Sequence, residues 1–223
     1  MAGSTSGVDE RGIPIIDEPA GSSLRKRQSI SGAALGEFLR EGYSAASVDV
    51  IARQAGVSKP TIYKHFGNKE RLFLAVIGGV LTDAYADLDP QSDRITEAAD
   101  LGAALTAFLG NWAGRVLGED ILALRRLVIG EVSRFPQLGQ LWFDLTHEMM
   151  DTPLIEAVAE LGRRGVLRVP DPRLAVRQLI AMTLGSLQLI ETFVPGREID
   201  GAEPDRIIAE GVAVFLSHYQ RRD

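Results

Sequence analysis

A short run of hydrogen-bonding side chains gives the first indication of chemistry in this sequence. Lys59, Thr61, Tyr63, Lys64 and His65 fall within seven consecutive residues. These side chains are of the types that reach DNA phosphates and base edges, because both present acceptor atoms to a donor. A threonine methyl group can also pack on the methyl group of thymine. The run therefore predicts a surface that binds nucleic acid.

The residues around this run predict two short helices joined by a tight turn. Gly56 suits the left-handed residue that ends the first helix. Ser58 suits the cap of the second helix, where its hydroxyl accepts from a backbone N–H. Pro60 falls in the first turn, where its missing N–H costs nothing. Two helices with such a turn form the core of a helix-turn-helix, whose second helix lies in the major groove.

A helical pattern before this pair completes a small domain. Apolar residues between Ile30 and Leu39 recur at the spacing of one buried stripe, and we expect the helix to stop at Gly42 and Tyr43. A pair of helices needs a third to close a core. The residues expected to meet inside are Ile30, Phe38, Val48, Ile51, Ala52, Val57, Ile62 and Phe66.

The side chains left outside this core are candidates for contact with DNA. Lys59 and Thr61 are expected near base edges, although Lys59 touching only phosphate is an equal alternative. Tyr63 and Lys64 are assigned to phosphate, with a core position as the alternative for Tyr63. His65 either donates to phosphate or merely packs. The candidate DNA-binding residues are thus Arg25, Arg27, Ser47, Ser58, Lys59, Pro60, Thr61, Tyr63, Lys64 and His65.

Charge divides unevenly along the chain. The formal net charge is −6, but residues 24–70 hold eight Lys or Arg and four Asp or Glu, a net charge of +4. The rest of the chain therefore carries −10. Local positive charge releases counterions from DNA, and an acidic body orients the protein by repulsion. Without the motif, an ordinary fluctuation of charge would be the alternative.

Four segments resemble the amino-terminal domain of the TetR family of transcriptional regulators. The resemblance implies an all-helical homodimer, in which the small domain binds DNA and the larger one binds a small effector. It also implies that Lys69 contacts phosphate. The segments are Ile30-x-x-Ala-Ala-x-x-x-Phe38, Gly42-Tyr43, Ser47-Val-x-x-Ile-Ala-x-x-Ala-Gly-Val-Ser58 and Thr61-Ile-Tyr-x-His-Phe-Gly-Asn-Lys-Glu70.

Two residues depart from the commoner pattern of that family. Ala46 stands where threonine is frequent, which removes a hydroxyl near the DNA backbone. Asp49 lies in the first turn of its helix, where a carboxylate favours the helix dipole but repels a nearby phosphate. We therefore expect this helix to contribute little to binding, through Ser47 and exposed N–H groups only.

The remaining chain predicts one helix after another, punctuated by prolines. The fold class is therefore all-α: a three-helix DNA-binding domain with a helix-turn-helix, followed by a larger helical domain for ligand binding and dimerisation. The expected parts are a disordered N-terminal arm at residues 1–21, the DNA-binding domain at 22–68 and the larger domain at 69–223. In the larger domain we expect helices at residues 70–88, 93–117, 120–135, 137–164, 172–193 and 204–220.

The first 21 residues are rich in Gly, Ser, Pro and acidic residues, which predicts disorder. They lack the basic and long apolar regions of a signal peptide. The apolar run from Ile13 to Ile16 leaves open a short partner-binding segment. No stretch approaches the roughly 18 apolar residues of a membrane helix. The absence of cysteine excludes disulfides and fits a reducing cytoplasm.

The last two helices are long and apolar, and the resemblance implies that they meet their copies in a four-helix dimer interface. A plain core is the alternative. Bulky residues on the middle helices suggest an effector cavity for a flat or hydrophobic molecule, although such residues more often form core. Asn111, Arg115 and His147 are further polar candidates. The candidate ligand-binding residues are Phe108, Trp112, Phe135, Trp142, Phe143, Thr146, Met150, Met182 and Gln188.

These observations predict a cytoplasmic, ligand-responsive, homodimeric regulator of transcription. We expect a repressor that binds a near-palindromic DNA operator and is released by a small effector, with no cofactor and no membrane partner. An enzyme is a weaker alternative, because the three histidines lie far apart and no nucleotide-binding glycine pattern occurs. A further alternative is an interaction module of the same fold that has lost operator binding.

Overall fold

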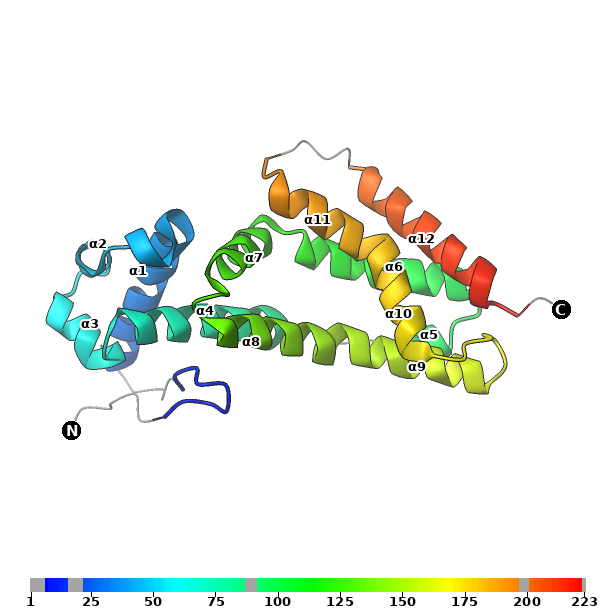
Figure 1. Cartoon of the computed structure of the whole chain (residues 1–223), viewed down its shortest axis with the longest axis horizontal. Coiled ribbons are helices and arrows are strands. Elements are labelled where there is room, and N and C mark those ends of the chain that lie inside the picture. The colour runs from blue at the N-terminus through cyan, green and yellow to red at the C-terminus, as the bar shows by residue number, and fades with distance from the viewer. Residues whose placement is uncertain (1–6, 16–21, 87–91, 197–200, 222–223) are drawn as a thin grey trace. The chain divides into compact units, whose positions relative to one another are not determined.

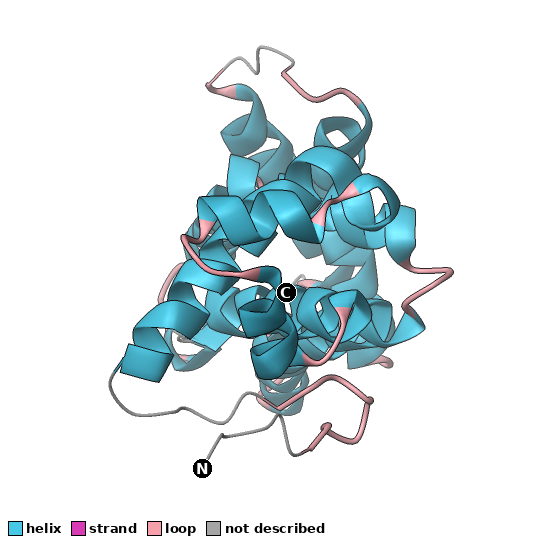
Figure 2. Cartoon of the chain, turned by 90° about the vertical axis from the view of Figure 1, so that its left-hand side faces the viewer, coloured by secondary structure: helices cyan, strands magenta, loops and turns pink. Residues whose placement is uncertain are grey.

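The computed structural model describes residues 7–15, 22–86, 92–196 and 201–221. Within these ranges the secondary structure is helical, and strand-like pairing is limited to two isolated bridges, Val8 with Pro14 and Leu167 with Gln220 (Figure 2). The expectation of an all-α fold is confirmed. None of the helices in the described ranges has the length and apolar character needed to span a membrane.

The chain divides into two compact units. The first combines residues 1–87 with 123–145, and the second combines residues 88–122 with 146–223. This division differs from the expected boundary between residues 68 and 69, because the helix after the DNA-binding domain and residues 123–145 belong to the first unit. The helices of the first unit (Figure 1) are α1 (Ser22–Ala45), α2 (Val48–Gln54), α3 (Lys59–Phe66), α4 (Lys69–Ala86), most of α7 (Glu119–Glu131) and α8 (Pro136–Thr146).

Helix α4 lies at the centre of the first unit. Every residue from Leu72 to Gly78 is buried, which is typical of a helix that is apolar all round and enclosed by its neighbours. The ring of Phe73 lies 4.9 Å from that of Phe38 on α1 and 4.9 Å from that of Phe135 just before α8, measured between centroids. Such aromatic pairs add about 0.5–1.5 kcal/mol each beyond their buried area. They join α1 and the start of α8 to α4.

The core predicted for the DNA-binding domain is confirmed, with one exception on α1. Val57 is partly buried against the cluster, while the other seven predicted residues are buried. Leu39, expected in the buried stripe, is instead exposed, because α1 turns that side away from the core. Helix α1 is interrupted at Gly42, whose φ of 71° is left-handed, as expected of the residue at which the helix stops.

Residues 7–15 form an ordered segment, which we call the N-terminal strap. Its ends approach each other at the bridge between Val8 and Pro14, and Ile13 is buried in the core of the first unit. The expectation of a disordered arm is therefore wrong for these residues, because Ile13 supplies an apolar anchor. Residues 1–6 and 16–21, including Ile16 of the predicted apolar run, lie outside the described residues.

The second unit is built from shorter helices than expected. Residues 93–117 form two helices rather than one, because the Asp100 carboxylate accepts from the Ala103 N–H at 2.9 Å and starts a new helix there. Gly211 allows a close approach, since a Cβ there would lie 2.5 Å from Thr183 Cγ2. The elements are α5 (Ser92–Thr96), α6 (Leu101–Val116), η1 (His147–Asp151), α9 (Thr152–Arg163), α10 (Pro172–Ile180), η2 (Ala181–Gly185), α11 (Ser186–Phe193) and α12 (Glu203–Tyr219).

Candidate nucleic-acid interface

The turn between α2 and α3 has the geometry that the sequence predicts. Gly56 has a φ of 66°, a left-handed value that an L side chain rarely adopts. Ser58 caps α3: its Oγ accepts from the Thr61 N–H at 3.3 Å and lies 2.8 Å from Thr61 Oγ1. The left-handed Gly56 thus follows the end of α2, and the Ser58 cap starts α3 shortly after it, as in a helix-turn-helix.

Helix α3 has one buried and one exposed face. Ile62 and Phe66, four residues apart, are fully buried in the core. Tyr63 and Lys64 are exposed, so the alternative of a core position for Tyr63 is excluded. Pro60 is also exposed, and Lys59, Thr61 and His65 are partly exposed. The predicted DNA-reading side chains of α3 therefore share the solvent side of one short helix.

An ion pair joins α2 to α3 on this surface. Lys59 Nζ lies 2.9 Å from Asp49 Oδ2; the Asp49 side chain is exposed and that of Lys59 is partly exposed. The hydrogen bond to Asp49 raises the pKa of Lys59, so the ammonium stays charged. The carboxylate nevertheless offsets the charge that Lys59 presents to a phosphate. We therefore expect Asp49 to weaken DNA binding through Lys59 as well as by direct repulsion.

A buried carboxylate that the sequence did not reveal positions the start of α2. Glu37 on α1 is only 3% exposed, and its Oε1 accepts from the Ser47 N–H at 2.9 Å. Its other oxygen pairs with Arg40. The Ser47 N–H is thus already satisfied. The Ser47 hydroxyl makes no capping bond, so Ser47 stays a candidate for DNA contact. In sequence, Glu37 has no feature that separates it from a solvated glutamate.

Arg27 must be withdrawn from the candidates for DNA contact. Its side chain is 4% exposed, its Nη2 donates to the His65 carbonyl at 3.3 Å, and its guanidinium lies 5.5 Å from the centre of the Phe66 ring. The residue therefore joins α1 to the end of α3 from inside the domain. Arg25 and Lys26 are exposed on the same helix, so Arg25 stays a candidate for the flanking phosphates.

Two further candidates, His65 and Lys69, have lowered pKa values. Burial lowers the pKa of the His65 imidazole, and the nearby charges of Arg27 and Lys64 lower it further. His65 therefore favours its neutral form and can contact phosphate as a neutral donor. Burial also lowers the pKa of Lys69, whose Nζ donates to the Ser44 carbonyl at 3.1 Å and lies 4.8 Å from the centre of the Tyr43 ring. Lys69 thus ties α4 to the end of α1.

Two family profiles match the chain. The profile described as bacterial regulatory proteins, tetR family, matches residues 30–76, which hold the helix-turn-helix. The profile described as the AefR-like transcriptional repressor C-terminal domain matches residues 103–221, more than half of the chain. The chain belongs to the TetR family of transcriptional regulators. Membership in this family makes it a transcriptional regulator rather than an enzyme.

Solved structures of regulators share the fold over most of the chain. A protein from Mesorhizobium loti assigned to the TetR family is 31% identical, with a TM-score of 0.76, over 91% of this chain and 100% of that one. The flavonoid-responsive regulator FrrA is 30% identical, with a TM-score of 0.68, over 89% of this chain and 99% of that one.

Curated HTH-type relatives match a shorter part. The HTH-type transcriptional activator FasR of Mycolicibacterium smegmatis is 43% identical over 67 residues, which are 26% of this chain and 31% of FasR. The chain spans between about a third and a half of the length of the first curated relatives that it matches.

The predicted ligand-binding residues are divided between the two units of this TetR-family chain. Phe135 belongs to the aromatic core of the first unit, so it is not available to line an effector cavity. Trp142, in the same unit, lies 6.5 Å from the Tyr85 ring, and Phe143 is exposed. In the second unit Phe108, Trp112 and Met150 are buried, Thr146 and Gln188 are partly buried, and Met182 is exposed.

The remaining polar candidates do not line either of two hollows on the surface of the described residues. Asn111 and Arg115 are exposed on α6, whereas His147 is partly buried with its Nδ1 3.4 Å from Asp151 Oδ2. A hollow of about 330 Å³ lies beside Leu39 and Leu127 in the first unit, and one of about 320 Å³ lies between α5 and α9 in the second. None of the predicted ligand-binding residues lines either hollow.

The Asp49–Lys59 pair yields a prediction about affinity. We expect Asp49→Asn to tighten DNA binding severalfold and to steepen the dependence of log affinity on log salt by up to about one unit, because Lys59 is freed for phosphate. Fluorescence anisotropy with a fixed duplex at several salt concentrations measures both. In a Lys59→Met background the gain should largely disappear. An equal gain with and without Lys59 would show that Asp49 acts only by direct repulsion.

Proposed function

We propose that the chain is a ligand-responsive repressor, located in the cytoplasm, that binds a near-palindromic operator as a homodimer. The observation that carries this proposal is the exposed face of α3, where Pro60, Tyr63 and Lys64 stand above the buried pair Ile62 and Phe66. A helix held in this way can enter a major groove with its first turn toward the bases. The net charge of +4 over residues 24–70 supports the proposal, because it favours counterion release.

A dimer accounts for the exposed apolar side chains of the last helices. Phe193 is 72% exposed, and Leu174, Met182, Leu189 and Val214 are exposed on α10, η2, α11 and α12. Burying one such side chain contributes about 1.5–3 kcal/mol, so a cluster of them favours association. Two copies of α3 then read two half-sites about 34–36 Å apart or somewhat more, which doubles the contacts of a single small domain.

A small aromatic or hydrophobic molecule is the proposed effector. Phe108 and Trp112 are buried on one side of α6 with ring centres 6.5 Å apart, and Met150 is buried in the same unit. Aromatic and methionine side chains suit the wall of a site for a flat apolar ligand. The description of FrrA as flavonoid-responsive supports this class. The effector releases DNA by favouring a dimer whose recognition helices no longer fit successive major grooves.

Selection of duplexes from fragmented genomic DNA tests the operator. The wild-type chain should enrich fragments that contain an inverted repeat. Lys64→Ala should weaken binding to all sequences and make the salt dependence shallower by about one unit, because one phosphate contact is lost. Arg173→Ala, an exposed basic residue of the second unit, is the matched control and should change neither. Enrichment of no fragment over random duplex would instead favour an interaction module without an operator.

Placing negative charge on the proposed dimer interface tests whether the chain dimerises there. Phe193→Glu together with Leu189→Glu should convert a dimer into a monomer in analytical ultracentrifugation, because two carboxylates would have to be desolvated on association. Operator binding should fall with it. Val132→Glu, an exposed apolar residue of the first unit, is the control. A double variant that stays dimeric would place the interface elsewhere.

Tryptophan fluorescence tests the effector site, since the chain has only two tryptophans. A panel of flavonoids should contain a compound that quenches the fluorescence and lowers affinity for the selected duplex. Trp112→Phe should remove most of the quenching, whereas Trp142→Phe should retain it, because Trp112 belongs to the second unit. Quenching that persists in Trp112→Phe and disappears in Trp142→Phe would move the site to the first unit.

A further inference from the structure

The N-terminal strap is a self-supporting turn. Asp9 Oδ1 accepts from the N–H groups of Arg11 at 3.0 Å and Ile13 at 2.8 Å, and the Asp9 carbonyl accepts from the Gly12 N–H at 2.9 Å. Gly12 has a φ of 83°, which favours glycine at this position of the turn. The Asp9 N–H donates to the Ile13 carbonyl at 2.8 Å. These bonds hold the shape of the strap through contacts within the strap itself.

The apolar end of the strap fits against α4 at a glycine. A Cβ built on Gly78 would lie only 2.8 Å from Ile13 Cγ2, closer than real Cβ contacts, and 3.7 Å from Leu141 Cδ2 of α8. The neighbouring Gly79 has nothing within 4 Å of the same position. Glycine weakens a helix interior relative to alanine, yet at residue 78 it is the residue that leaves room for Ile13.

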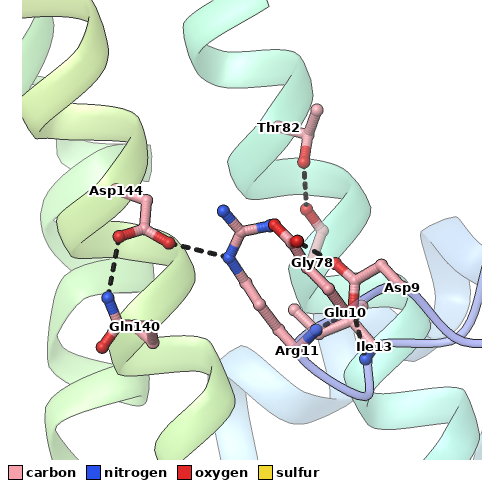
Figure 3. Close-up of polar contacts among 8 residues, drawn as sticks. All are labelled: Asp9, Glu10, Arg11, Ile13, Gly78, Thr82, Gln140 and Asp144. Atoms are coloured by element: carbon pink, nitrogen blue, oxygen red, sulfur yellow. Dashed lines mark hydrogen bonds and ion pairs between the residues drawn. The ribbon is translucent and has the colours of Figure 1, made fainter.

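The polar end of the strap pairs with α8 (Figure 3). Arg11 Nε donates to Asp144 Oδ2 at 2.7 Å, and Gln140 Nε2 donates to the other carboxylate oxygen at 2.7 Å. Both Arg11 and Asp144 are about three-quarters buried, so water screens this pair less than an exposed one. The strap thus contacts α4 through Ile13 and α8 through Arg11.

We propose that the strap is a positioning device that fixes α4 against α8 and thereby sets the affinity of α3 for its operator. This inference rests on the proposed function. Only Gly67 and Asn68 separate α3 from α4, and α3 packs on α4, so a shift of α4 moves the recognition helix. At its other end α8 continues directly into η1 and α9, which belong to the second unit. The strap therefore connects the helix that carries α3 with the helix that leads to the effector unit.

Gly78→Ala tests the proposal without altering the strap, and Gly79→Ala is the matched control. The new methyl group at residue 78 should displace Ile13 and expose the bond after Arg11. Trypsin should then cleave the full chain after Arg11 at least about fivefold faster, because overpacking at residue 78 raises the population in which the strap is detached. Affinity for the duplex selected by the wild-type chain should fall about twofold to thirtyfold. Gly79→Ala should leave the cleavage rate and the duplex affinity within about twofold of wild type.

Further variants distinguish an effect of losing the strap contacts from an effect of a general loss of stability. In an Ile13→Ala background Gly78→Ala should cause no additional loss, because the methyl groups that clash are gone. Asp144→Asn should also speed cleavage after Arg11 and lower operator affinity, while the thermal midpoint of the unit shows that it stays folded. Equal cleavage of Gly78→Ala and Gly79→Ala would overturn docking of the strap, and faster cleavage with unchanged operator affinity would overturn its positioning role.

Failure of the proposed function gives a different result. If the wild-type chain selects no duplex, operator binding is contradicted. Hydrogen exchange of the α4 amides in the full chain then tests whether the strap holds α4. Faster exchange in Gly78→Ala than in Gly79→Ala supports the strap as the element that holds α4. Equal exchange in the two variants overturns it.

Discussion

Burial of α4 on all sides is the constraint on which the first unit depends. Seven consecutive residues from Leu72 to Gly78 are enclosed, so the helix cannot shift without disturbing neighbours in several directions. The Phe73 ring contacts aromatic residues of α1 and of the segment before α8 at once. Because densely packed interiors transmit strain rather than absorb it, a displacement at one end of α4 is felt at the other. A displacement of α4 also displaces the recognition helix α3, since only two residues separate the two helices.

Several charged groups of the DNA-binding part are used to hold the domain together. Arg27 is enclosed against Phe66 and the end of α3, Glu37 accepts from the Ser47 N–H just before α2, and Lys69 contacts the end of α1. Removing one partner of such a buried contact leaves a desolvated polar group, which is costly. The positive charge of residues 24–70 is therefore only partly available to DNA. Lys64 and Arg25 are exposed, whereas Asp49 offsets Lys59.

Local features of the fold were predictable where neighbouring residues decide the conformation. The left-handed Gly56, the Ser58 cap and the buried row of Ile62 and Phe66 follow from spacing alone, since each involves contacts within a few residues. The interruption of α1 at Gly42 was predictable for the same reason. Arg27 was misread and the role of Glu37 was not predicted, because their hydrogen-bond partners lie thirty-eight and ten residues away. A charged residue in a helical pattern ordinarily indicates a solvated face.

The strap and the aromatic residues show the same limit over longer distances. A stretch rich in Gly, Ser and Asp has the composition of a disordered arm, yet one isoleucine meets a glycine of α4 and one arginine meets Asp144, 133 residues away. Nothing in the sequence around Phe135 distinguishes a ring in the core from a ring that lines a ligand site. The amino-acid order by itself determined the all-helical fold class, the helix-turn-helix and the family, because these depend on local periodicity and spacing. Only the tertiary structure decided which charges and rings face inward, because their burial depends on chain segments brought together by folding.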